Sequence, residues 1–215
     1  MGTIERKEKE KNLRRADIIG AAEALFFEKG YDRVTMDEIA KKAEFSKRTL
    51  YSYFESKEQL LHAIMYRAYS TLNSLINVEL NNKEKLNGLQ KLKLLGGVYI
   101  NFINLYPKYF EMIAYYNGSK CELPADDEYR VMSDQEGDKT LQNLVRFIYE
   151  GIQDGSVRPD IDVKKTAFVL YANIIGIASL VLNKASYLYE HRLMAEDFVE
   201  EMFGFMERSI AKTII

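Results

Sequence analysis

The residues best suited to chemistry lie between Phe45 and Phe54, where lysine, arginine and hydroxyl side chains follow one another closely. Lysine and arginine can donate hydrogen bonds to guanine O6 and N7 in the major groove of DNA. Serine, threonine and tyrosine hydroxyls can donate to phosphate oxygens. From Lys41 to Lys57 there are five basic and two acidic residues, although the whole chain carries a net charge of −2. This local excess of positive charge indicates a surface for nucleic acid.

A second basic run lies near the N-terminus, where residues 6–15 include six basic and two acidic residues. Such a run can contact phosphates that flank a binding site, or it can be a solvated start of a helix. The sequence leaves both interpretations open.

Enzymatic groups are harder to find. The two histidines, His62 and His191, are far apart in sequence and have no catalytic motif around them. A single cysteine, Cys121, is too few for a cysteine-based zinc site. The acidic residues between Asp126 and Asp138 lack the spacing of a calcium loop. We therefore expect no enzymatic activity, no metal site and no cofactor.

Helix signals surround the basic stretch and predict how it is positioned. A first helix is expected at about residues 9–29, ended by Gly30. Thr35-Met-Asp-Glu38 and Ser56-Lys-Glu-Gln59 are capping boxes, in which a hydroxyl and a carboxyl or amide group satisfy free backbone N–H groups reciprocally. Ser46 can cap the helix between them, after a tight turn at Glu44-Phe45.

The rest of the chain also has helical periodicity. We expect helices at about residues 57–80, 84–106, 107–118, 133–154, 162–183 and 193–212, with Ser133 and Asp162 as two of the caps. No segment has the alternation of a strand. The sequence therefore predicts an all-α fold of about nine helices, with an N-terminal three-helix domain at 1–57 and a larger helical bundle at 58–215.

Two short helices joined by a tight turn predict a helix-turn-helix, whose second helix enters the major groove of DNA. Ala40 and Ala43 are small enough for close helix crossing, and Leu50 and Phe54 supply an inner face. The outward set on the second helix is then Lys47, Arg48, Tyr51 and Ser52.

The sequence resembles the TetR family of bacterial transcriptional regulators over about residues 13–65. The resemblance rests on Phe26-Phe-Glu-Lys-Gly-Tyr31, on Thr35 with Ile39-Ala40, and on Ser46-Lys-Arg-Thr-Leu-Tyr-Ser-Tyr-Phe54 followed by Ser56-Lys57-Glu58. It implies base-facing roles for Lys47, Arg48 and Tyr51. It implies phosphate-facing roles for Thr35, Ser46, Thr49, Ser52, Tyr53 and Lys57.

Glu44 departs from this pattern, because many relatives have glycine in the turn. If the position is left-handed, a residue other than glycine costs about 1 kcal/mol. A carboxylate here also repels phosphate unless it points away from the DNA.

The resemblance further implies a small-molecule pocket in the larger bundle. Aromatic walls with a few polar tips are typical of such pockets, although an aromatic stripe can equally be plain core. The expected lining, for a hydrophobic or aromatic effector, is Tyr99, Phe102, Ile103, Tyr106, Phe110, Ile113, Tyr116, Phe147, Tyr171 and Asn173.

The last two long helices look like a homodimer interface. Residues 167–182 are apolar nearly all round, which requires cover on several sides. The expected contact residues are Ile174, Ile177, Val181, Phe198, Met202, Phe205 and Met206. A two-fold dimer would place two recognition helices one turn of duplex apart, about 34–36 Å, or a multiple of it, on a near-palindromic operator.

The sequence therefore predicts a cytoplasmic repressor of transcription, released from double-stranded DNA when an effector binds the bundle. The N-terminus is charged, unlike a secretory signal, and residues 167–182 are too short to span a membrane. The alternative is a helical adaptor that binds only protein, but an adaptor does not explain the basic residues Lys47, Arg48 and Lys57.

Overall fold

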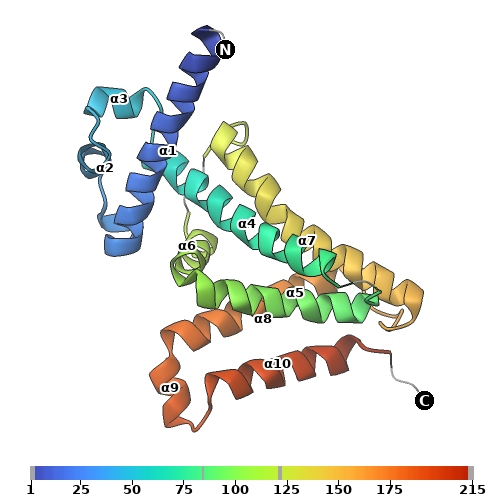
Figure 1. Cartoon of the computed structure of the whole chain (residues 1–215). Coiled ribbons are helices and arrows are strands. Elements are labelled where there is room, and N and C mark those ends of the chain that lie inside the picture. The colour runs from blue at the N-terminus through green and yellow to red at the C-terminus, as the bar shows by residue number, and fades with distance from the viewer. Residues whose placement is uncertain (1–2, 84, 121–122, 213–215) are drawn as a thin grey trace. The chain divides into compact units, whose positions relative to one another are not determined.

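A computed structural model describes residues 3–83, 85–120 and 123–212, so Cys121 lies outside the described residues. Within them every regular element is a helix (Figure 1). The α-helices are α1 (Thr3–Lys29), α2 (Met36–Lys42), α3 (Lys47–Tyr51), α4 (Lys57–Asn81), α5 (Gly88–Leu105), α6 (Pro107–Gly118), α7 (Glu128–Asp154), α8 (Val163–Asn183), α9 (Ala185–Glu190) and α10 (Ala195–Ile210). A short 3₁₀ helix, η1, covers Tyr31–Arg33. The all-α prediction is confirmed, and the additional helix is the six-residue α9.

The chain divides into two compact units that are not continuous in sequence. One contains Met1–Arg67 and Ser119–Asp134, and the other contains Ala68–Gly118 and Gln135–Ile215. Helices α4 and α7 each begin in the first unit and end in the second. The functional boundary predicted between residues 57 and 58 stays a prediction.

The first unit is organised around α1. Its apolar stripe, Ile18, Ala22, Leu25 and Phe26, is buried as the spacing predicts. Leu50 of α3 and Phe54 just after it are fully buried. The inner side of the short helices is therefore fixed by core packing, and their outer side is left to solvent.

Side-chain caps fix where the short helices begin. The Thr35 hydroxyl accepts from the Glu38 amide, and the Glu38 carboxylate accepts from the Thr35 amide at 2.9 Å, so the first capping box is confirmed. Ser46 caps α3 by accepting from the Thr49 amide at 3.1 Å. Ser56 accepts from the Gln59 amide, but the Gln59 side chain accepts from the amide of Glu55, one residue earlier than expected.

Three predicted helix starts were wrong, and the first is that of α1, which begins at Thr3 rather than near residue 9. Helix α7 begins at Glu128, where Asp127 accepts from the amides of Tyr129 and Arg130, and Ser133 lies inside the helix. Asp127 is as good a cap as Ser133, and no proline or glycine separates the two, so the helix continues through the serine. Similarly, α5 begins at Gly88 rather than near residue 84, because Asn87 forms a capping box with Gln90.

The second unit contains α4 from Ala68 onward, α5 and α6, most of α7, and α8 to α10. Helix α10 packs on α5 and α8. Glycines allow two close approaches, since a Cβ on Gly88 would overlap the Gly151 backbone and one on Gly96 would overlap the Phe203 ring. Helix α10 therefore lies against α5 through an aromatic ring that requires glycine beneath it.

Candidate functional site

The turn between α2 and α3 is a Schellman motif built around Glu44. The Phe45 amide donates to the Ala40 carbonyl at 3.0 Å, and the Glu44 amide donates to the Lys41 carbonyl at 3.2 Å. Glu44 has φ 60°, the left-handed conformation usually taken by glycine. The position is therefore left-handed, as considered from the sequence, and the turn that leads into α3 carries backbone strain.

The outer face of α3 has the character expected of a recognition helix. Lys47 and Arg48 are exposed, and Tyr51 is 42% exposed. The Lys47 ammonium lies 2.8 Å from an Asp37 carboxylate oxygen on α2, and this contact raises the pKa of Lys47. Charged donors and a phenol thus project from one short, rigid element.

The hydroxyl residues around α3 already take part in capping. The Ser46 and Thr49 hydroxyl oxygens are 2.8 Å apart, and the Ser52 hydroxyl donates to the Thr49 carbonyl at 2.6 Å. The Thr35 hydroxyl lies 3.0 Å from the Glu38 carboxylate, and Tyr53 is half-buried. The Thr35, Ser46 and Thr49 hydroxyls therefore lie at the starts of α2 and α3, where helix N-termini favour phosphate, whereas Ser52 lies at the end of α3.

Lys57 has a structural role that the sequence did not indicate. Its ammonium donates to the Tyr31 and Val34 carbonyls, each at 3.0 Å, and lies 4.2 Å from the centre of the Tyr31 ring. The Tyr31 hydroxyl in turn donates to Glu58 at 3.1 Å. Lys57 therefore ties the start of α4 to the segment that leads into α2.

The start of α7 contacts the same unit, and no sequence signal indicated this. The Gln59 side chain donates through Nε2 to an Asp127 carboxylate oxygen at 2.7 Å. The Tyr129 ring centre lies 5.0 Å from that of Phe54. The buried Ser133 hydroxyl lies 2.6 Å from His62 Nδ1. These three contacts connect the first turns of α7 to α4 and to Phe54, which follows α3.

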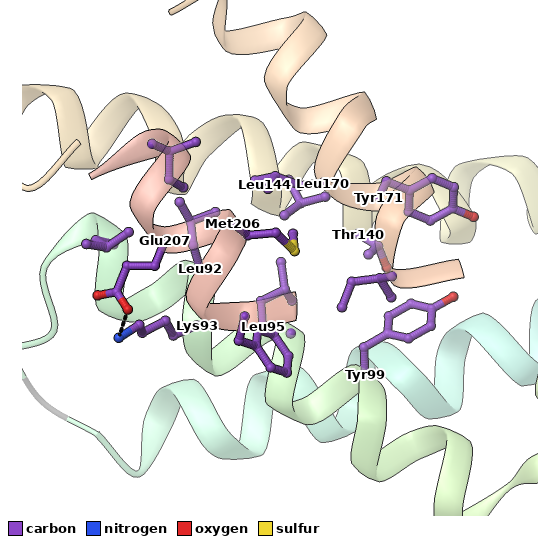
Figure 2. A pocket seen from close by; sticks show the side chains of 15 residues that line it. Leu92, Lys93, Leu95, Tyr99, Thr140, Leu144, Leu170, Tyr171, Met206 and Glu207 are labelled. Atoms are coloured by element: carbon purple, nitrogen blue, oxygen red, sulfur yellow. Dashed lines mark ion pairs between the residues drawn. The ribbon is translucent and has the colours of Figure 1, made fainter. Parts of the chain in front are cut away.

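The second unit contains a narrow cavity with about 50 Å³ of space for the centres of water molecules (Figure 2). Its walls come from α5, α7, α8 and α10. The lining residues are Leu89, Leu92, Lys93, Leu95, Gly96, Tyr99, Thr140, Leu144, Leu170, Tyr171, Ile174, Phe203, Met206, Glu207 and Ile210.

Of the ten residues predicted to line a pocket, the cavity includes Tyr99 and Tyr171. Tyr106 is exposed and Tyr116 is partly exposed, and exposed Asn173 donates to the Val169 carbonyl of its own helix. The remaining five are buried away from this cavity: Phe102, Ile103, Phe110, Ile113 and Phe147. The type of a side chain alone did not distinguish residues that line the cavity from residues buried elsewhere in the core. The residues that α10 contributes to the lining depend on tertiary packing.

Polar groups line the cavity at two places, one with Tyr99 and Tyr171 and the other with Lys93 and Glu207. The Tyr99 hydroxyl is buried without a hydrogen-bond partner among the described residues, and burial raises the pKa of Tyr99 well above its usual value. Burial also raises the pKa of Tyr171, which accepts a long hydrogen bond from Asn117. Elsewhere in the wall, Lys93 and Glu207 form an ion pair at 2.6 Å.

Apolar side chains remain exposed on α8 and α10. Phe168 and Phe205 are 53% and 65% exposed. Among the residues predicted to form a dimer interface, Phe205 is exposed and Ile177, Val181 and Phe198 are partly exposed. The other three face inward within this chain: Ile174 and Met206 line the cavity, and Met202 is buried. Helix α8 extends beyond residues 167–182 to 21 residues, and by length and composition alone it could cross a membrane, so the expectation that this segment is too short was wrong.

Comparison with known proteins finds relatives of the N-terminal region and one that matches most of the chain. Residues 18–64 match the family described as "Bacterial regulatory proteins, tetR family". The biofilm operon regulator IcaR of Staphylococcus aureus is 39% identical over 64 residues, 30% of this chain and 34% of IcaR. The transcriptional repressor KstR2 of Mycolicibacterium smegmatis is 24% identical over 156 residues, 70% of each chain.

The fold is shared over almost the whole length. A crystal structure of AibR in complex with isovaleryl coenzyme A and operator DNA has a TM-score of 0.67 and 23% identity. The match covers 89% of this chain and 97% of AibR. The described helices therefore form an N-terminal helix-turn-helix bundle joined to a larger helical bundle.

Proposed function

We propose a ligand-released repressor of transcription for this chain, which belongs to the tetR family of bacterial regulatory proteins. Residues 1–57 form the proposed DNA-binding domain, and residues 58–215 the ligand-binding and dimerisation domain. The observation that carries the proposal is the outer face of α3, which exposes Lys47, Arg48 and Tyr51 while Leu50 is fully buried.

In this proposal α3 enters the major groove of double-stranded DNA. Lys47, Arg48 and Tyr51 meet base edges, and Arg48 is the residue best suited to bidentate recognition of guanine. The hydroxyls at the starts of α2 and α3 hold phosphates, which set register without reading sequence. The Thr35 and Ser46 caps support this role because they lock those hydroxyls at helix N-termini.

A homodimer accounts for the exposed apolar face of α8 and α10. Phe168, Val169 and Phe205 are each more than half exposed, which is costly for large apolar side chains in water. A second copy of the chain can cover them around a two-fold axis. The same cover explains an apolar α8 in a cytoplasmic protein, without a membrane.

The effector is proposed to be a small hydrophobic or aromatic molecule that binds the cavity of the second unit. The cavity walls support this, since leucine, isoleucine, phenylalanine and methionine predominate in them. AibR, which has the same fold, was crystallised in complex with isovaleryl coenzyme A and operator DNA. A corresponding arrangement here makes the cavity the regulatory site.

Helix α7 is the proposed link between effector and DNA. Its first turns hold Phe54 and His62 through Tyr129 and Ser133, and further along it supplies Thr140 to the cavity wall. A ligand that favours one position of α7 would bias the placement of α3. It would thereby shift the population toward dimers with wrongly spaced recognition helices.

Selection of binding sites from a random duplex library tests the proposal. We expect enrichment of a near-palindrome whose half-sites lie about 10 base pairs apart, or a multiple of this, as the dimer geometry requires. An Arg48→Ala variant is the matched control and should lose preference at one position in each half-site. Absence of any enriched sequence would contradict the proposed function.

A further inference from the structure

We infer that the cavity binds a compact, uncharged, largely apolar molecule through one oxygen atom that accepts a hydrogen bond from the Tyr99 hydroxyl. This inference rests on the proposed function, which makes the cavity the effector site. It adds the chemistry by which the effector is recognised.

The Tyr99 hydroxyl is the polar group in the cavity that most needs a partner. The side chain is 3% exposed, and its oxygen has no hydrogen-bond partner among the described residues. Leaving a buried hydroxyl unpaired is costly, because it loses its bonds to water and gains none in exchange. A ligand oxygen placed beside Tyr99 removes this cost, so the free protein favours ligands that carry an acceptor.

The surroundings of Tyr99 suit one polar atom on an otherwise apolar ligand. Tyr99 of α5 and Tyr171 of α8 lie at the same end of the cavity, with Thr140 of α7 nearby (Figure 2). The rest of the wall is mainly aliphatic or aromatic, with Leu92, Leu95, Leu144, Leu170 and Met206 among its members. The polar group of the ligand is thereby directed to Tyr99, and its body to the leucines.

Charge in the wall argues against an anionic effector. Among the described residues that line the cavity, the charged ones are Lys93 and Glu207, which neutralise each other at 2.6 Å. Lys93 is six residues before Tyr99 on α5, about 9 Å along the helix axis. Figure 2 places the ion pair at the end of the cavity opposite Tyr99. A carboxylate beside Tyr99 would therefore be buried without a cation.

The narrowness of the cavity favours a compact ligand. Its space for water centres, about 50 Å³, corresponds to a few water molecules. The Phe203 ring of α10 occupies the groove above Gly96 and limits the space on that side. The space therefore favours a small ligand over a long chain, and a single substituted ring enters only if the side chains of the wall move outward, since a cavity that binds benzene measures about 150 Å³.

Three probes of nearly equal shape separate the possibilities: acetophenone, ethylbenzene and benzoate. Calorimetric titration of the full chain should show that acetophenone binds about fivefold more tightly than ethylbenzene, the usual contribution of one hydrogen bond. Benzoate should bind more weakly than acetophenone. In Tyr99→Phe, which removes only the hydroxyl, acetophenone and ethylbenzene should bind equally. Tyr149→Phe, a change on the exposed side of α7, should behave like wild type.

Three results would overturn the inference: tighter binding of benzoate than of acetophenone, an unchanged preference in Tyr99→Phe, or no binding of acetophenone up to its solubility limit. Operator binding is measured separately, without any probe. A protein that prefers acetophenone but ignores DNA would refute the proposed function and leave the ligand chemistry standing. A protein that binds its operator but shows no preference at Tyr99 would refute only the ligand chemistry.

Discussion

The two compact units of this chain are specified in different ways. In the first unit, α2 and α3 are only seven and five residues long, and caps from Thr35 and Ser46 fix their starts. In the second unit, α5 and α8 are 18 and 21 residues long, and packing between segments distant in sequence determines the cavity. Local side-chain chemistry therefore predicts the position and outer face of α3, whereas the cavity depends on packing between distant segments.

The tertiary fit of the second unit is tested most severely by Gly88→Ala. A Cβ at this position would overlap the backbone of Gly151, and a backbone cannot rotate away as a side chain can. We expect the free energy of unfolding, measured by urea titration, to fall by about 3 kcal/mol.

Gly97→Ala is the control for this substitution, because a Cβ at Gly97 would meet nothing within 4 Å. It should stabilise α5 by about 0.5–1 kcal/mol, since alanine is the better helix former. Equal effects of the two substitutions would show that close packing between α5 and α7 does not govern the second unit.

The local character of the first unit is tested by Arg48→Ala. Loss of this exposed guanidinium should cost about 1–3 kcal/mol of binding to the preferred operator and relax preference at one base position. Binding to duplexes of known sequence, followed by fluorescence anisotropy, measures both effects.

Tyr53→Phe is the companion change, because it removes one predicted phosphate contact. It should weaken binding to all sequences alike, by about 1 kcal/mol. If both variants lose affinity with the same dependence on sequence, the division into base-facing and phosphate-facing residues is wrong.

The strained turn of the first unit offers a smaller effect. Glu44→Gly should raise the free energy of unfolding by up to about 1 kcal/mol, because glycine adopts φ 60° without a Cβ clash. Glu44→Gln keeps the strain and removes only the charge. A gain in DNA affinity shared by both variants would identify repulsion of phosphate, and a gain in stability limited to glycine would identify relief of strain.

The smallest effect concerns pH and the cap of α2. The Lys29 ammonium, which donates to Glu38, and the Thr35 amide and hydroxyl lower the pKa of Glu38 from 4.5 to about 2. A carboxylate with a lowered folded-state pKa contributes stability above its unfolded pKa, and loses this contribution as pH falls toward the folded value. Urea midpoints should therefore decrease between about pH 4.5 and 2. Glu38→Gln should remove part of that decrease, and an unchanged pH profile would contradict this account of the cap.

The sequence predicts features that depend on neighbouring residues better than features that depend on packing between distant segments. The Thr35 and Ser46 caps and the burial of Leu50 and Phe54 followed from residues close together in the chain. The start of α7 did not, because Asp127 and Ser133 are both capable caps, and the helix begins after Asp127 and continues through Ser133.

The cavity was the least predictable feature. Tyr99 and Tyr171 were expected in its wall, but Phe102 and Phe147 are equally aromatic and lie in the core. Phe203 and Glu207 reach the cavity because α10 packs on α5 and α8, which helical periodicity alone does not specify. The second role of Lys57, which donates to two backbone carbonyls, also depends on where η1 lies.

The most direct test of DNA recognition by the first unit is the salt dependence of binding to the selected near-palindrome and to a scrambled duplex of equal length. We predict that the logarithm of the association constant falls linearly with the logarithm of salt concentration for both duplexes, because lysine and arginine release counterions from the phosphates. The near-palindrome should bind more tightly than the scrambled duplex at every salt concentration. Binding that is independent of salt, or equal for the two duplexes, would contradict the account.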